Sequence, residues 1–273
     1  NDQVYIDRFR GARQDHNLVV LEGFHAIKHA IRFKAELLEI LDSPESNIQQ
    51  LIANHAPDIS EVIANKLELV SPVIFDQLSP ITPPTGVIAL ARRPRITPGQ
   101  LMNHSPHAPV ILLENLRNLL SIGAAIRVAA AAGAGGVLTT GTQDPWHPAA
   151  TIAAAGLQFA LPVTRTDAVP TSIRVMIPVD PLGQPLGLHT TLPSHSIIAF
   201  GAERVGLIKT PEELRLSHIY SNDSGRLELE SSDSRFRNII FMEADIRPLI
   251  IMLFIEDVPK SHPVKRFQYY LDL

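Results

Sequence analysis

The stretch from residue 110 to residue 141 has the pattern of a strand, a helix and a second strand. Its first apolar run, Val110–Leu113, is short and uninterrupted, as in a parallel strand that is buried on both faces. A polar loop over 114–121 follows, then an alanine-rich helix over 122–132 that ends at the glycine-rich segment 133–136. Because open α/β sheets bind ligands beyond the carboxyl ends of their strands, this pattern predicts a site in the polar loop.

Residues 1–92 show a second alternation of strand and helix signals, which predicts a small α/β domain. A strand over 18–21 precedes a helix with apolar residues at helical spacing over 24–31. Similar signals continue over 37–41, 48–54, 59–65, 67–70 and 73–75. The domain ends with a turn at 83–86 and a strand over 87–91.

The segment 93–108 is predicted to be a linker because it contains few large apolar residues and several helix- and strand-breaking ones. These are Pro94, Pro98, Gly99 and Pro106, and Pro109 follows the segment directly. Arg92, Arg93 and Arg95 stand at its start. Such a charge run is usually a solvated segment, and the alternative is a contact with phosphate.

The second domain is expected over 109–273. Beyond the opening unit we expect a helix over 149–156, a strand near 159–163 at a sheet edge and a strand over 197–200. Helices are expected over 211–216 and 239–256, the latter kinked at Pro248.

The composition narrows the class of protein. With 45% hydrophobic residues and 19% charged ones, the 273-residue chain is expected to fold around sizeable cores. A net charge of −4 gives no global attraction to nucleic acid, although a local basic patch is compatible with that total. The absence of cysteine excludes disulfides and thiolate chemistry. No apolar run approaches the ~20 residues that span a bilayer, so we expect a cytoplasmic protein without a membrane partner.

Two loops carry the candidate chemistry. Gly123 and Arg127 lie in the helix that follows the first strand, and Arg127 interrupts an apolar pattern, so it is expected to be paired or to bind a ligand. The second loop, Gly201-Ala202-Glu203-Arg204-Val205-Gly206, follows another strand. Both loops follow strands of one domain, so Glu203 is the expected partner of Arg127. On local signal alone, a helix-packing glycine and an ordinary strand-to-helix turn are equally compatible with these sequences.

The eleven histidines do not form a metal-binding pattern. His25 and His29 have ligand spacing on one helix, but no third ligand is evident, and we expect no metal.

At the two loops the chain resembles the SpoU (TrmH) family of RNA ribose 2′-O-methyltransferases, which belongs to the SPOUT superfamily. The family's first motif, N-x-x-N-x-G-x-x-x-R-x-A, corresponds here to Asn118-Leu-Leu-Ser121-Ile-Gly123-Ala-Ala-Ile-Arg127-Val-Ala129. Its second motif, F-G-x-E-x-x-G-L, is complete from Phe200 to Leu207. The segments L-V-V-L-E-G-F-H-A-I and P-T-G-V-I-A of the first domain are similar to the family's substrate-binding domain.

The resemblance implies a SPOUT-type domain with a parallel sheet and a carboxyl-terminal trefoil knot, a homodimer, and S-adenosylmethionine as the methyl donor. It implies transfer to a ribose 2′-hydroxyl of rRNA or tRNA. The residues implied in catalysis are Arg127, Glu203, Ser121 and Asn118. Those implied in donor binding are Thr139, Thr140, Gly141, Phe200, Gly201, Gly206 and Ile219. We expect Arg8, Arg10 and Arg13 of the first domain to contact RNA.

The family's Arg127 counterpart has been proposed as general base. A guanidinium with a pKa above about 12 is a poor proton acceptor at neutral pH, so we expect Arg127 to orient phosphate and stabilise the developing alkoxide.

Two departures from the family keep a second hypothesis open. Ser121 replaces the second asparagine of the first motif, and the third motif, which normally lines the donor pocket, is not recognisable. The alternative is therefore a knotted RNA-binding protein of the same fold with impaired catalysis. A plain α/β interaction domain is disfavoured by two motifs in the right order.

Overall fold

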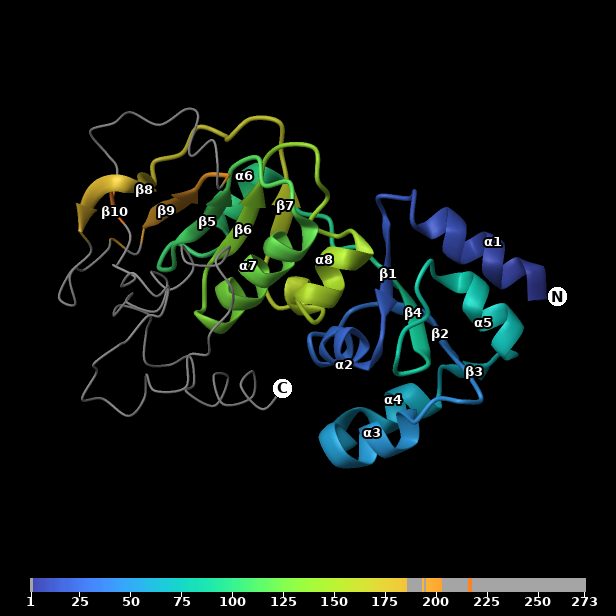
Figure 1. Cartoon of the computed structure of the whole chain (residues 1–273). Coiled ribbons are helices and arrows are strands. Elements are labelled where there is room, and N and C mark those ends of the chain that lie inside the picture. The colour runs from blue at the N-terminus through green and yellow to red at the C-terminus, as the bar shows by residue number, and fades with distance from the viewer. Residues whose placement is uncertain (1, 186–192, 194, 203–215, 218–273) are drawn as a thin grey trace, which may run out of the picture.

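The structure is a computed structural model, and it describes residues 2–185, 193, 195–202 and 216–217. The described chain forms two sheets, one from residues 18–92 and one from residues 110–217 (Figure 1). The α/β class and the parallel sheet predicted from the sequence are confirmed.

The first sheet is four-stranded and mixed. It contains β1 (Leu18–Glu22), β2 (Leu37–Asp42), β3 (Leu67–Leu69) and β4 (Val87–Arg92) in the order β1-β4-β2-β3. Strand β4 is antiparallel to both β1 and β2, and β3 is parallel to β2. One face is covered by α2 (Phe24–Arg32) and α3 (Ile48–His55), the other by α1 (Asp2–Ala12) and α5 (Pro72–Leu78). The short helices η1 (Pro57–Ile59) and α4 (Ser60–Ala64) follow α3.

The second sheet is six-stranded and its strand pairs are all parallel. It contains β5 (Val110–Leu113), β6 (Gly136–Thr139), β7 (Val163–Arg165), β8 (Val175–Pro185), β9 (Ser196–Phe200) and β10 (Leu216–Ser217), in the order β10-β8-β9-β5-β6-β7. Helix α6 (Pro98–His104) covers one face. Helices α7 (Leu119–Ala131) and α8 (Pro148–Ala153) and the short η2 (Leu157–Phe159) cover the other.

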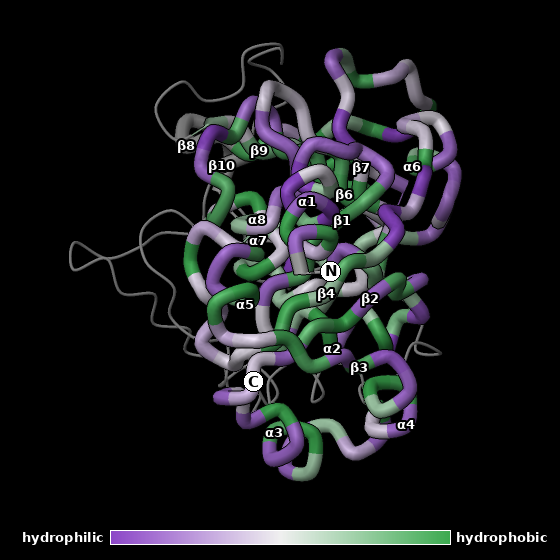
Figure 2. Tube along the Cα trace, turned by 90° about the vertical axis from the view of Figure 1, so that its right-hand side faces the viewer, coloured by the Kyte–Doolittle hydropathy of each residue, from purple (hydrophilic) through white to green (hydrophobic). Residues whose placement is uncertain are grey.

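Strand β5 shows why a central strand can consist of apolar residues alone. Val110 and Leu112 pack with α6, whereas Ile111 and Leu113 pack with α7. All four residues are buried, because a parallel strand between two helical layers has no solvent face. In Figure 2 the central strands carry hydrophobic colours, while the surface helix α3 alternates between hydrophilic and hydrophobic colours.

The two sheets share one hydrophobic cluster, which runs from α2 into α7 and α8. At the contact, Gly156 has a left-handed φ of 74°, and a Cβ on it would lie 2.9 Å from Ala26 Cα. Only glycine permits this approach of the turn after α8 to the backbone of α2. The first sheet is thus packed directly against the helical layer of the second.

Several elements differ from the sequence prediction. Helix α1 and strand β8 were not predicted. Helix α6 lies inside the predicted linker, where Thr97 and Gln100 form a capping box and Leu101 is fully buried. The strand predicted near 159–163 begins only at Val163, after Pro162, and it is an edge strand as expected.

Several predictions fall outside the described residues: the trefoil knot, the helix over 239–256 and the helix over 211–216, except that Leu216 lies in β10. Among the described residues, no helix is both long enough and apolar enough to cross a bilayer.

Candidate functional site

The carboxyl ends of β5, β6 and β9 lie side by side at one edge of the second sheet. Leu113 at the end of β5 is in register with Thr139 of β6 and with Phe200 of β9. The backbone joins these ends, since Glu114 N–H donates to the carbonyl of Phe200 (2.8 Å) and Thr140 N–H donates to that of Leu113 (3.0 Å). Residues Thr139, Thr140, Gly141, Phe200 and Gly201 therefore lie at one edge of the sheet.

Gly141 allows the loop after β6 to fold closely against the loop after β5. Its φ is 88°, and a Cβ at this position would lie 2.7 Å from Asn115 Oδ1. Thr140 Oγ1 accepts a hydrogen bond from Asn115 N–H at 3.0 Å, while Asn115 itself has a left-handed φ of 55°. Two residues in left-handed backbone conformations, which glycine and asparagine tolerate, and a side-chain hydrogen bond fix the shape of this edge.

Thr139, the last residue of β6, carries a buried hydroxyl at this edge. The side chain is 1% exposed, and among the described residues its buried Oγ1 has no hydrogen-bond partner. A buried hydroxyl without a partner is costly, so this position favours a ligand that supplies one.

Asn118 serves as the N-cap of α7. Its Oδ1 accepts hydrogen bonds from Leu120 N–H (2.8 Å) and Ser121 N–H (3.4 Å), which are unsatisfied donors of the first turn. The helix therefore begins at Leu119, earlier than the predicted 122, and Ser121 lies in its first turn rather than in a loop. The capping role was readable from the sequence, because asparagine is a preferred N-cap residue.

Gly123 is a helix-packing glycine. A Cβ there would lie 2.7 Å from Ala153 Cβ and would also meet the carbonyl oxygen of Ala150, both in α8. The glycine thus allows α7 and α8 to pack closely, and of the two interpretations left open by the sequence this geometry supports packing.

Arg127 lies on the side of α7 that faces α2. Its side chain is half-buried, and burial lowers the pKa of its guanidinium. Two residues of α2 have lowered pKa values, His25 and Lys28; burial is the main cause for both, and the positive charge of Arg127 makes a smaller contribution. Lys28 is 4% exposed, and its pKa is lowered to about 8 by burial first and then by Arg32 and Arg127.

The sequence analysis did not single out Lys28. A lysine on the apolar face of a helix, between Ile27 and Ala30, is the signal that would have found it, as the same logic found Arg127. Lys28 lies on α2, which covers the first sheet, and Arg127 lies on α7, which covers the second. Only the folded chain therefore shows that the two cations are neighbours.

The predicted site residues Glu203, Gly206 and Ile219 lie outside the described residues. The proposed Arg127–Glu203 pair therefore stays a prediction.

The three arginines predicted to contact RNA are not equivalent. Arg13 is largely buried and donates to Glu22 Oε1 (2.5 Å) and to the carbonyl of Leu78 (2.9 Å). Arg8 is half-exposed and pairs with Glu39 at 2.6 Å. Arg10 is exposed on α1. Arg13 thus holds α1 to the sheet, and Arg10 is the most accessible of the three.

The histidine pair of α2 does not act as a unit. His25 is exposed, whereas His29 is fully buried with its Nδ1 2.7 Å from the carbonyl oxygen of Ala155. No group of three potential metal ligands occurs in the part of the chain that the structure describes.

The fold defines a class of protein: it is shared with the SpoU RNA methyltransferases. The SpoU methyltransferase AviRb from Streptomyces viridochromogenes, in complex with AdoMet, matches with a TM-score of 0.66 and 15% identity over 91% of this chain and 96% of that one. An RNA 2′-O ribose methyltransferase matches with a TM-score of 0.61 and 22% identity over 92% of this chain and 93% of that one. The AdoMet-bound rRNA methyltransferase from Sinorhizobium meliloti matches with a TM-score of 0.60 and 18% identity over 92% of each chain.

These structures confirm the predicted resemblance at the level of fold. No family sequence model and no curated protein sequence matches the chain.

Proposed function

We propose that this chain is an RNA methyltransferase of the SpoU (TrmH) family, which transfers the methyl group of S-adenosylmethionine to a ribose 2′-hydroxyl of rRNA or tRNA. The observation that carries the proposal is the meeting of the carboxyl ends of β5, β6 and β9 beside the Arg127 helix. Sequence motifs and fold agree, since the first two family motifs follow β5 and begin at the end of β9, and similar solved structures are RNA methyltransferases.

The residues at this edge fit the donor. Thr140 N–H and the Gly141 carbonyl are already hydrogen-bonded, to Leu113 and Arg165, whereas Thr139 Oγ1 is a buried hydroxyl for which the described residues supply no partner. The close approach of Gly141 to Asn115 leaves no room for a side chain at position 141. S-Adenosylmethionine supplies a methyl group already activated by a sulfonium. The protein is therefore required mainly to align the acceptor oxygen and to exclude water.

Arg127 contributes positive charge at the acceptor side. Burial lowers the pKa of its guanidinium, yet a guanidinium starts from above about 12 and remains a cation at neutral pH. In this role Arg127 holds a phosphate of the target nucleotide and stabilises negative charge that develops on the ribose oxygen. Lys28 adds a second cation from the first sheet.

The remaining parts of the proposal concern organisation. We propose an RNA-binding domain over 1–92 and a methyltransferase domain over 109–273, joined by 93–108, with the knot and a homodimer as in the family. The homodimer is tested by light scattering of the purified protein, in which a monomer mass would reject it.

The activity is tested by incubating the protein with S-adenosylmethionine labelled on its methyl group and total cellular RNA, then mapping the product. Label at a ribose 2′-oxygen is expected. Arg127→Ala is expected to abolish transfer while donor affinity, measured by calorimetry, stays nearly unchanged. Arg127→Lys tests whether charge alone suffices, and exposed Lys66→Ala serves as the matched control. Turnover retained in Arg127→Ala would reject the assigned role.

The calorimetric titration with S-adenosylmethionine also distinguishes an active transferase from the alternative, an RNA-binding protein of the same fold with impaired catalysis. Ser121 in place of asparagine favours a protein with impaired catalysis that still binds RNA. RNA binding without measurable donor binding would establish that alternative and exclude an active transferase.

A further inference from the structure

A basic groove runs along the segment that joins the two sheets. Two open cavities, of about 360 and about 520 Å³, lie on either side of Pro94 and share the walls formed by Arg93 and Arg95. Lys34 and Arg92 line the first cavity and Arg165 lines the second. We call these two cavities together the junction groove.

The cations of the junction groove exceed its carboxylates. Only Glu36 and Asp144 line it with negative charge, and both are engaged by arginines: Arg92 Nε lies 3.0 Å from Glu36 Oε1, and Arg93 NH1 lies 2.8 Å from Asp144 Oδ2. Arg95 instead donates to the neutral amide oxygen of Asn17 at 2.5 Å, so its charge is not compensated there. In a chain of net charge −4, this is a local concentration of positive charge.

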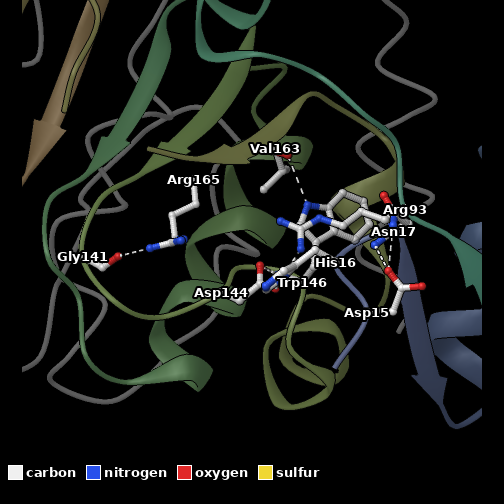
Figure 3. A network of polar contacts seen from close by, with 9 residues as sticks. All are labelled: Asp15, His16, Asn17, Arg93, Gly141, Asp144, Trp146, Val163 and Arg165. Carbon is white, nitrogen blue, oxygen red and sulfur yellow. Dashed lines mark hydrogen bonds and ion pairs between the residues drawn. The ribbon is translucent and has the colours of Figure 1, made fainter. Parts of the chain in front are cut away.

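Arg93 forms the rigid centre of the groove. Its guanidinium carbon lies 5.5 Å from the centroid of the Trp146 ring, and its side chain is only 14% exposed. Its backbone N–H also donates to the carbonyl of Asn17 at 2.8 Å. Figure 3 shows Arg93, Asp144 and Trp146 in contact, with His16 and Asn17 beside them. The groove is therefore built in advance of any ligand.

Arg165 connects the groove with the candidate site. It lines the larger cavity and donates through NH1 to the carbonyl of Gly141 at 2.9 Å, as Figure 3 shows. Asp167 lies 3.6 Å away but is almost fully exposed, so solvent screens that pair. Gly141 belongs to the proposed donor loop, so the positive charge reaches the edge of the sheet where transfer is proposed.

Two aromatic residues line the smaller cavity. Phe33 and Phe159, both half-buried, line it together with Lys34 and Arg92, and the Phe159 ring packs edge-to-face on Trp146 with a centroid distance of 5.1 Å. A positively charged groove with aromatic side chains is the arrangement that binds single-stranded nucleic acid, through phosphate contacts and base stacking.

We propose that the junction groove binds a single-stranded segment of the substrate RNA and leads it toward the Gly141 loop. The proposal rests on the proposed function for the identity of the substrate. It differs from the sequence-based prediction, which placed the RNA contacts on Arg8, Arg10 and Arg13 of α1.

The test compares two variants that each lose three positive charges. The groove variant combines Lys34→Asn, Arg92→Ala and Arg95→Ala; asparagine suits the left-handed φ of 60° at residue 34. The control combines Arg8→Ala, Arg10→Ala and Lys66→Ala on the first sheet's other surfaces. Arg93 is left in place because its pair with Asp144 is part of the packing. Binding of a fluorescently labelled oligouridylate is followed by anisotropy between low and moderate salt.

We expect the groove variant to lose at least about tenfold in affinity, and its slope of log K against log salt to flatten by about 2, or ~0.7 for each lost phosphate contact in single strands. The control is expected to change much less. Equal losses in both variants, or wild-type affinity and slope in the groove variant, would overturn the proposal.

Two further measurements keep the interpretation unambiguous. Thermal unfolding and S-adenosylmethionine titration of the groove variant are expected to match those of the wild type, since its three side chains are solvent-exposed or paired at the surface. Methyl transfer by the wild type is scored separately. Oligouridylate binding without transfer would reject the proposed activity and leave the groove supported, whereas transfer by a protein whose groove variant binds normally would reject the groove alone.

Discussion

The Nδ1 atom of His29 in α2 lies 2.7 Å from the carbonyl oxygen of Ala155 at the end of α8, a contact that spans 126 residues of sequence. Because a carbonyl only accepts, Nδ1 carries the proton of a neutral ring. His29 is fully buried, and burial lowers its pKa to about 4, against the opposing effect of this hydrogen bond. A neutral histidine thus joins the helical layers of the two sheets.

This contact predicts a pH-dependent stability. The ordinary pKa of about 6.5 applies to the unfolded chain, so between pH 6.5 and 4 the unfolded state binds more protons than the folded state. The free energy of unfolding is therefore expected to decrease as the pH is lowered from 6.5 to 4, by on the order of 3 kcal/mol from this group. Urea denaturation across the window measures it. His29→Gln is expected to flatten the dependence and exposed His107→Gln to leave it intact; an unchanged slope in His29→Gln contradicts the assignment.

The sequence was sufficient for elements whose pattern is local. The fully apolar run Val110–Leu113 matched β5 residue for residue, since a strand buried on both faces has no polar position. Strand β8 was missed because Pro178, Pro181 and Pro185 fall within it, and proline opposes a strand assignment. Tertiary pairing with β9 and β10 overrides that preference, and pairing across such distances has no local signature.

The same distinction holds for the site. The polar loop after β5 and the unusual position of Arg127 were readable from pattern alone. The proximity of Arg127 to His25 and Lys28 of α2 was not, because it depends on how the two sheets pack. The position of Gly123 was identified correctly, but whether it served a ligand or a neighbouring helix depended on α8.

Gly123→Ala is expected to destabilise the fold although alanine favours helices. The added Cβ would lie 2.7 Å from Ala153 Cβ, and overpacking of this kind costs about 1–3 kcal/mol, more than the ~1 kcal/mol gain in helix propensity. Gly11→Ala in α1 is the control, since a Cβ there meets nothing within 4 Å. The two changes are expected to shift the denaturation midpoint in opposite directions. A stabilised Gly123→Ala protein would show that α7 and α8 are not packed as described.

Arg174 is expected to be the most sensitive arginine for stability. It is 5% exposed, and its guanidinium donates to the carbonyls of Met102 (2.8 Å), Ala108 (2.8 Å), Ser196 (3.4 Å) and Ser105. Arg174→Met leaves several buried carbonyls without donors, at about 1–3 kcal/mol each, so a loss of about 3 kcal/mol or more is expected in urea denaturation. Arg174→Lys is expected to recover part of it. Exposed Arg10→Met serves as control, and a loss equal to the control's contradicts the role.

Lys28 is expected to show a conflict between stability and activity. The folded protein holds this lysine with a pKa of about 8, below the ordinary 10.5, so the unfolded chain binds its proton more tightly between these values. Below pH 8 the buried charge lowers the free energy of unfolding, and stability from this group rises as the pH increases from 8 to 10.5. Lys28→Met is therefore expected to raise the free energy of unfolding at pH 7 by about 1–3 kcal/mol and to remove that rise.

The same variant is expected to lower methyl transfer, because it removes a cation beside Arg127 that no stability argument requires. Lys66→Met, at an exposed position, is the control for both measurements. If Lys28→Met is more stable and fully active, the buried lysine has no part in the reaction, and Arg127 acts without it. If it is more stable and less active, the cost of burying Lys28 is explained by its use in binding the phosphate of the acceptor nucleotide, as is common where function opposes stability.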